Sequence, residues 1–255
     1  MTTVNKYNYF APKLQMEYCG SSQFKSFLKC PAKAMAVLNG EWDTEETVAL
    51  LIGSYVDSFF DNTLDAFKSE HPEIFKRDGS LKAEYEKADA IIARVQQDEL
   101  FMKYMGGEKQ VIKTGEIDGV PFKIKMDSYH KGKAIVDLKV IRDFQPIWDD
   151  ERGCKLDFIH YWGYDYQAAI YQAIEGNKLP FYICAVTKES TPDLAVIHIP
   201  QAWIDSAMAE IRNEIPLIDA IKRGEIEANR CGQCDYCRAT KKLSRVISAD
   251  ELESD

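Results

Sequence analysis

Long apolar runs are missing from this sequence of 255 residues. The segment MTTVNKYNYFAPKLQ has no apolar core of signal-peptide length, and no later run approaches the length that spans a membrane. Internal repeats and low-complexity linkers are missing too, while the apolar and charged fractions are those of an ordinary globular protein. We therefore expect a cytoplasmic protein with no membrane partner, organised as one domain over residues 1–255.

An excess of positive charge is also missing, because 41 aspartates and glutamates outnumber 32 lysines and arginines and the net charge is −9. This balance argues against a broadly basic surface that coats nucleic acid. It does not exclude a nuclease, which needs carboxylates for a metal ion and only a local basic track for phosphate. Two such tracks exist, each explained equally well by solvated strand or tail residues: Lys123, Lys125, Lys131 and Lys133, then Arg238, Lys241, Lys242 and Arg245.

Cysteine is scarce but clustered. The seven cysteines are an odd number, and in a reducing compartment a cluster favours metal binding over disulfides. Cys231, Cys234 and Cys237 form a C-x₂-C-x₂-C run. Such a run is more typical of a 4Fe–4S cluster, whose fourth ligand comes from elsewhere, than of a zinc site built from two C-x₂-C pairs. Zinc stays the alternative, and the possible fourth ligands are Cys19, Cys30, Cys154 and Cys184.

The first hundred residues show helical periodicity. Ser21 and Ser22 are good caps for a first helix, and Asp43 with Glu46 resembles a capping box that opens a second one. This helical part, residues 20–105, is predicted to be an insertion or cap on the remaining fold. Its helices are expected over 23–39, onward from the capping box, and over 63–105 with breaks near 71–72 and 78–79.

The apolar period changes from helical to two between Gln110 and Val140. Asp118-Gly119 and Lys131-Gly132 are turn signals that divide this stretch into an antiparallel meander. Together with later helices and strands, it predicts a mixed α/β fold with a central sheet flanked by helices, and a core over residues 108–222. The expected strands are 110–117, 120–129, 133–141, 181–188 and 194–199, and the later helices are 157–175 and 201–222.

The meander carries the residues most suited to catalysis. Asp137 and Lys139 share one face of an otherwise apolar strand, where two charges are costly unless they are paired or bind a cation. Asp127 on the preceding strand would face them. Two such carboxylates suit Mg²⁺ or Mn²⁺, and a neighbouring ammonium suits phosphodiester hydrolysis. A cross-strand ion pair is the structural alternative for these three residues.

The pattern Asp127…Asp137-x-Lys139 resembles the PD-(D/E)XK nuclease superfamily, with Met126 in place of a loosely kept proline. Downstream, Gln167-Ala-Ala-Ile-Tyr171 is similar to the Q-x-x-x-Y element of its RecB-like branch, and four residues of spacing put both side chains on one helical face. The resemblance implies a restriction-endonuclease-like fold. It also implies that Asp127, Asp137 and the Leu138 carbonyl hold the metal, that Lys139 positions the attacking water, and that Gln167 and Tyr171 contact DNA or support the metal site.

A third metal ligand is expected on an upstream helix. RecB-like nucleases carry G-x-x-x-H there, whereas this chain has Gly53-Ser-Tyr-Val-Asp57. The resemblance places Asp57 in the position of the usual histidine, and a carboxylate is a competent ligand for a hard cation. The alternative is an amphipathic helix that exposes Asp57 on its polar face. Glu116 on the first strand is a weaker candidate.

Cys30 gains support as the fourth cysteine ligand from its context. The stretch from Ser21 to Cys30-Pro31 resembles the start of the iron–sulfur subset of RecB-like nucleases, in which a serine-capped helix leads to Cys-Pro. The resemblance implies that Cys30, Cys231, Cys234 and Cys237 hold a 4Fe–4S cluster, so that the cysteine segment 228–245 closes onto Cys30.

The layout as a whole is similar to phage and prophage exonucleases of the RecE (exonuclease VIII) kind. This resemblance implies a deoxyribonuclease that releases 5′-phosphates from linear DNA with free ends during recombination, with a single-strand annealing protein as a possible partner. A catalytically weak or inactive DNA-binding or assembly module is the alternative, favoured by the missing histidine and the acidic charge. Activity on RNA or on a nucleotide is a third interpretation that nothing in the sequence separates from the first.

Overall fold

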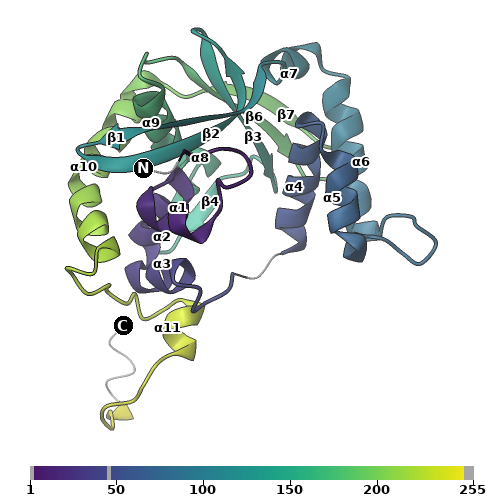
Figure 1. Cartoon of the computed structure of the whole chain (residues 1–255). Coiled ribbons are helices and arrows are strands. Elements are labelled where there is room, and N and C mark those ends of the chain that lie inside the picture. Colours follow the sequence, from purple (N-terminus) through teal and green to yellow (C-terminus); the bar gives the residue numbers. More distant parts are fainter. Residues whose placement is uncertain (1–2, 45–46, 250–255) are drawn as a thin grey trace.

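A five-stranded mixed sheet forms the centre of the protein (Figure 1). The structure is a computed structural model and describes residues 3–44 and 47–249. The strand order is β1-β2-β3-β6-β7, with the β3–β6 pair parallel and the other neighbours antiparallel. A small hairpin, β4–β5, lies outside this sheet. The bounds are β1 Glu108–Ile117, β2 Val120–His130, β3 Ala134–Ile141, β4 Ile147–Asp149, β5 Cys154–Leu156, β6 Phe181–Thr187 and β7 Leu194–His198.

Helices cover both faces of the sheet, so the fold has three layers (Figure 1). In order along the chain they are α1 Pro12–Glu17, α2 Ser21–Lys29, α3 Pro31–Leu38, α4 Val48–Phe60, α5 Leu64–Glu70, the 3₁₀ helix Pro72–Ile74, α6 Ala83–Gln96, α7 Glu99–Tyr104, α8 Phe158–Tyr161, α9 Tyr164–Glu175, α10 Gln201–Lys222 and α11 Asp235–Ala239.

Alternate residues of β3 enter two different hydrophobic cores, as the period of two predicts. Ile135 and Ile141 pack in a core with residues of α2, α9 and α10. Val136 and Leu138 face the other way and pack with residues of α4, α6 and α7. The predicted mixed α/β fold is therefore confirmed. Within the helical part before the sheet, α4–α7 form one layer, because the second face of the sheet is apolar and must be covered, whereas α2 packs on the first face.

Two predicted helices are interrupted where the backbone cannot continue. The helix expected over 23–39 breaks at Cys30, which is extended with φ −162° because the following Pro31 disfavours a helical residue before it. The N-cap of α2 is Gly20, so Ser21 and Ser22 lie inside the helix instead of capping it. The helix expected over 157–175 breaks before α9 at Gly163, whose φ of +61° is left-handed.

The capping box predicted at Asp43 and Glu46 does not open α4. Glu46 lies outside the described residues, and the helix begins at Val48 with Thr47 as its N-cap. The Thr47 hydroxyl accepts a hydrogen bond from the Leu50 amide at 3.3 Å. The breaks predicted near 71–72 and 78–79 are confirmed, whereas α1, α11 and the β4–β5 hairpin were not predicted because each is too short to show a period.

Glu175 at the end of α9 anchors this helix to the β1–β2 pair. Its buried carboxylate accepts hydrogen bonds from the Tyr129 hydroxyl at 2.7 Å and the Lys113 ammonium at 2.9 Å, and Asn177 donates two more. Burial raises the pKa of Glu175, but these donors outweigh it and bring the pKa down to about 2. The carboxylate therefore stabilises the fold while it is ionised.

Replacing Glu175 by Ala is expected to lower the free energy of unfolding by about 2–3 kcal/mol, because Tyr129 and Lys113 lose a charged acceptor. Urea unfolding at pH 7 measures this loss. Since the folded pKa lies below the ordinary value of 4.5, the contribution is complete above that pH and disappears as the pH falls toward 2. Glu214→Ala on the exposed side of α10 is the control, and equal stability of both variants would contradict the prediction.

Candidate functional site

The site forms where β2 and β3 separate. Their pairing covers Ser128–His130 against Ala134–Val136 and stops just before Asp127 and Asp137. Beyond that point the Leu138 amide donates instead to the Asp127 carboxylate at 3.0 Å. Because the amide and carbonyl of one strand residue point the same way, the Leu138 carbonyl faces the same gap. The fork thus gathers two carboxylates and a backbone carbonyl.

Asp137 is held by two partners although only 2% of it is exposed. Its Oδ2 forms an ion pair with the Lys139 ammonium, and its Oδ1 accepts a hydrogen bond from the Gln167 amide at 2.6 Å. Burial alone would lower the pKa of Lys139, but its interactions with Asp137, Tyr164 and Asp127 together outweigh burial and raise the pKa. An ion pair within β3 is therefore present at the fork, in place of the cross-strand pair considered from the sequence, and Lys139 carries its proton at neutral pH.

One face of α9 supplies three side chains to the fork, at spacings i, i+3 and i+7. Tyr164 lies against Lys139, with 4.8 Å from the ammonium to the ring centroid. Gln167 holds Asp137, and the Tyr171 hydroxyl donates to the Lys125 carbonyl at 2.9 Å. Tyr164 was not predicted as a site residue. Its position one turn before Gln167 on the same helical face could have indicated it. The structure brings Gln167 and Tyr171 to the site as supports of the strands.

A second unpredicted residue, Lys25 of α2, lies against the same aromatic ring. Its ammonium is 5.0 Å from the Tyr164 centroid and donates to the Trp162 carbonyl at 3.0 Å. Burial, followed by repulsion from Lys139, lowers the pKa of Lys25 to about 8. Two lysines therefore lie against one tyrosine beside the carboxylates, and the spacing of residues 25 and 139 in the sequence could not reveal this contact.

The third predicted carboxylate, Asp57, reaches the same cleft from α4. Burial and then the neighbouring Asp61 raise the pKa of Asp57 to about 6, and Asp137 adds to this. Burial and then Asp137 likewise raise the pKa of Asp127 well above its ordinary value. Burial and mutual repulsion therefore oppose the ionisation of these carboxylates, and a bound divalent cation would favour their ionised forms.

The cleft has a volume of about 830 Å³. All four predicted metal ligands and the neighbouring lysine line it: Asp57, Asp127, Asp137, Leu138 and Lys139. Carboxylate and carbonyl oxygens are the ligands that Mg²⁺ and Mn²⁺ prefer. The donor chemistry thus fits such an ion. The aspartates, however, are spaced more widely than the four cysteine thiols. Among the described residues, the four cysteines are the only group of three or more acidic, histidine or cysteine side chains whose ligand atoms lie close together.

Two residues considered from the sequence differ in position: Glu116 lies outside the cleft, whereas Lys123 lines it but is tied to the N-terminal segment. Glu116 is exposed on β1 opposite Pro121 and is not among the residues that line the cleft. Lys123 is only 1% exposed and donates to the Tyr9 carbonyl at 2.6 Å. Burial and then Lys222 lower the pKa of Lys123 to about 8. The first basic track is therefore not a continuous phosphate-binding surface, because one of its members is a structural anchor.

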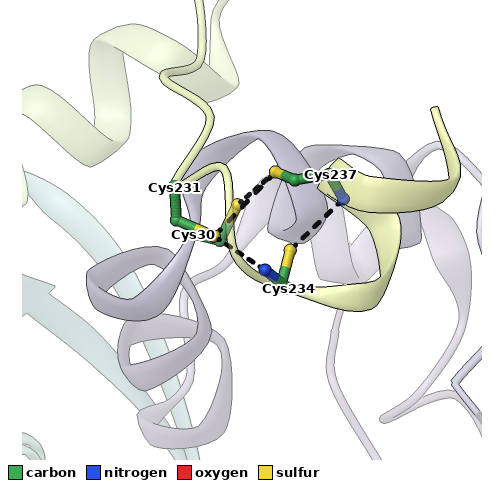
Figure 2. Close-up of side chains that lie close together, drawn as sticks. All are labelled: Cys30, Cys231, Cys234 and Cys237. Atoms are coloured by element: carbon green, nitrogen blue, oxygen red, sulfur yellow. Dashed lines mark hydrogen bonds between the residues drawn. The ribbon is translucent and has the colours of Figure 1, made fainter. Parts of the chain in front are cut away.

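The structure also brings the four predicted cysteines together, although Cys30 and Cys237 are 207 residues apart (Figure 2). Their sulfur atoms all lie within 4.8 Å of one another. Cys30 Sγ is 3.6 Å from Cys237 Sγ, and Cys231 Sγ is 3.9 Å from it. Backbone amides of Cys234 and Gln233 lower the pKa of Cys231 to about 6, which favours the thiolate that binds metals.

Contacts around the thiols fix the C-terminal segment to α3 independently of any metal. The Ala32 amide donates to the Asn229 carbonyl at 3.0 Å, and Lys33 forms an ion pair with Asp235. Arg230 donates to the Cys237 carbonyl at 3.0 Å. These contacts hold the four cysteines close together without a metal ion. They also place α11 beside α3, as Figure 1 shows.

The forked sheet, its two carboxylates and lysine, and the glutamine of α9 define a protein of the PD-(D/E)XK superfamily. Residues 20–240 match the family described as "PDDEXK-like domain of unknown function", and the chain belongs to it. Among the described residues, none of the helices has both the length and the apolar character needed to cross a membrane.

A solved structure agrees with this assignment. The crystal structure of a "Putative exonuclease" from Eubacterium rectale, at 2.19 Å resolution, is 44% identical, with a TM-score of 0.94 over 100% of this chain and 99% of that chain. A second structure, of SSO0001, is 14% identical over 76% of this chain and 84% of that chain, and its TM-score of 0.28 is too low to carry an argument. Among curated proteins, none matches the chain.

Proposed function

We propose that residues 1–255 form one metal-dependent nuclease domain that degrades DNA from its ends. The observation that carries this proposal is the fork, where Asp127, Asp137 and Lys139 meet at the base of an open cleft. The similarity to a protein described as an exonuclease supports the choice of reaction. The RecB-like branch and the RecE kind of exonuclease are proposed on the sequence motifs.

Each residue at the fork has a proposed role in phosphodiester hydrolysis. Asp127, Asp137 and the Leu138 carbonyl hold Mg²⁺ or Mn²⁺, with Asp57 as the third carboxylate. The bound ion would polarise the phosphate and lower the pKa of the attacking water. Lys139 carries a positive charge beside Asp137 and is placed to orient water or to neutralise charge on the phosphate. Gln167 keeps Asp137 in position, and hydrolysis leaves a 5′-phosphate.

The four cysteines have a structural role in this proposal, because they lie outside the cleft and join α3 to the C-terminal segment. One tetrahedral ion with metal–sulfur bonds of 2.3 Å separates its sulfurs by about 3.8 Å. The two shortest sulfur separations, 3.6 and 3.9 Å, are close to that value. A 4Fe–4S cluster places four iron atoms between the sulfurs and needs wider spacing. These distances favour zinc, the alternative of the sequence analysis, and the cluster stays a prediction that metal analysis decides.

The proposed activity is tested by incubating labelled linear and closed circular DNA with the protein and Mg²⁺ or Mn²⁺. An exonuclease acting on free ends shortens only the linear DNA and stops when a chelator removes the ion. Cleavage of both substrates would instead identify an endonuclease. Tight binding of DNA without any cleavage would support the inactive DNA-binding module. Repeating the reaction on linear DNA with a single-strand annealing protein tests the proposed partner. Annealed products are expected, because the nuclease exposes complementary single strands.

A further inference from the structure

A second groove of about 890 Å³ adjoins the cleft and runs along α2 and α3 toward the cysteine site. It shares four lining residues with the cleft, so the two hollows are neighbours: Phe10, Gln15, Ser22 and Gln23. Its far end is lined by Cys30 and Cys234. The groove therefore extends from the edge of the cleft to the cysteine site. Its lining residues have no role in the proposed hydrolysis.

The lining of this groove combines apolar side chains with two lysines, Lys29 and Lys33. Within residues 3–44 and 47–249, no aspartate or glutamate lines it, although acidic residues outnumber basic ones in the chain as a whole. One face of α2 presents Ser22, Ser26 and Lys29 at spacings i, i+4 and i+7. Lys33 of α3 is also there, paired with Asp235, whereas Lys29 forms no ion pair within the described part of the chain. The groove is thus a local exception to the acidic surface.

Two exposed aromatic rings stand where the groove meets the cleft. Phe10 lines both hollows and is 68% exposed. Trp162 lines the cleft, is 45% exposed, and its ring centroid is 5.5 Å from the Lys29 ammonium. Exposed rings of this size beside a lysine offer the stacking surface and the charge with which proteins bind unpaired nucleotides.

We infer that this groove binds one unpaired strand of the nucleic-acid substrate and leads it between the fork and the cysteine site. A duplex keeps its bases stacked inside, so exposed rings suit a separated strand better than a duplex. Lys29 contacts the phosphates, Phe10 and Trp162 stack on bases, and Ser26 lines the path. The inference rests on the proposed nuclease function, since it assigns a route to the substrate of the same site.

The test measures binding in an Asp137→Asn background, in which the substrate stays intact. Fluorescence anisotropy with labelled oligothymidylate of 25 nucleotides gives the affinity, and a salt series gives the slope of log affinity against log salt. Lys29→Glu and Ser26→Glu are each expected to weaken binding about tenfold. Loss of the lysine should also reduce the slope by about 0.7, the value for one phosphate contact with a single strand. Lys103→Glu, exposed on α7 and outside both hollows, is the charge-matched control.

The outcomes separate this inference from the proposed function. If Lys29→Glu and Ser26→Glu bind as Lys103→Glu does while the wild type still cuts linear DNA, the groove inference is overturned and the nuclease stands. An equal loss of affinity for a blunt hairpin duplex would overturn the assignment to a single strand. If the wild type neither cuts nor binds DNA, both ideas fail. Unchanged circular dichroism and melting temperature of the two groove variants exclude misfolding as the cause.

Discussion

Replacing Asp137 by Asn is expected to lower the rate of DNA cleavage by a factor of at least about 10²–10³, the usual cost of losing a group that stabilises charge in a transition state. The amide is a poor metal ligand, and it leaves the buried Lys139 ammonium without its ionised partner. Gln167 would still face the side chain, so the fold should persist. Steady-state cleavage of linear DNA at several Mn²⁺ concentrations measures the effect.

Replacing Lys139 by Met keeps the length of the side chain and is expected to cause a loss of similar size. Since Asp137 and Lys139 act as a pair, the double variant should be little worse than either single one. Glu214→Gln and Lys103→Met, both exposed and distant from the cleft, are the matched controls. Residual cleavage equal to that of the wild type in both site variants would mean that the fork is not the catalytic centre.

Replacing Cys30 by Ser is expected to release most of the bound metal and to lower the stability of the fold by several kcal/mol. One ligand of four is lost, and with it the link between positions 207 residues apart. Closing so long a loop contributes up to about 5 kcal/mol by chain entropy when the link is a disulfide, and a metal link acts in the same way. The hydrogen bonds and the ion pair around α11 would keep part of this contact.

Metal analysis and absorption spectra of anaerobically purified protein measure the same site directly. One zinc per chain and a colourless solution would support the single tetrahedral ion. About four irons with broad absorbance near 400 nm would establish the cluster predicted from the sequence. Cys154→Ser is the control, because Cys154 is exposed on β5 and is not part of the thiol group. Wild-type metal content and melting temperature in Cys30→Ser would contradict the structural role.

The parts of the fold that were predictable are those with a clear period or a distinctive local motif. The meander and the α10 helix follow from their apolar spacing, and the confirmed strand order places Asp127 beside Asp137. Gln167 and Tyr171 reach the strands because one helical face carries both. Cys30 was placed by its resemblance to a family motif, since spacing alone cannot select one distant cysteine among four.

The parts that were not predictable depend on contacts between segments far apart in the sequence. Lys123 looks like a surface lysine, yet the N-terminal segment covers it and its ammonium bonds the Tyr9 carbonyl. Lys25 meets Tyr164 and Lys139 only in the folded chain. The sequence predicted a cap where α4–α7 form a layer, because the apolar face of a helix does not specify the surface that it covers. That surface is the second side of β3 and β6.

The position of the four thiols in the chain also sets an order for biosynthesis. A ribosome makes Cys30 early, but Cys231, Cys234 and Cys237 follow every strand of the central sheet. The sheet and its helices can therefore assemble on the emerging chain, whereas the last three ligands become available only afterwards. If these thiols bind a metal ion as proposed, its capture would be the closing step of maturation, after the central sheet has formed.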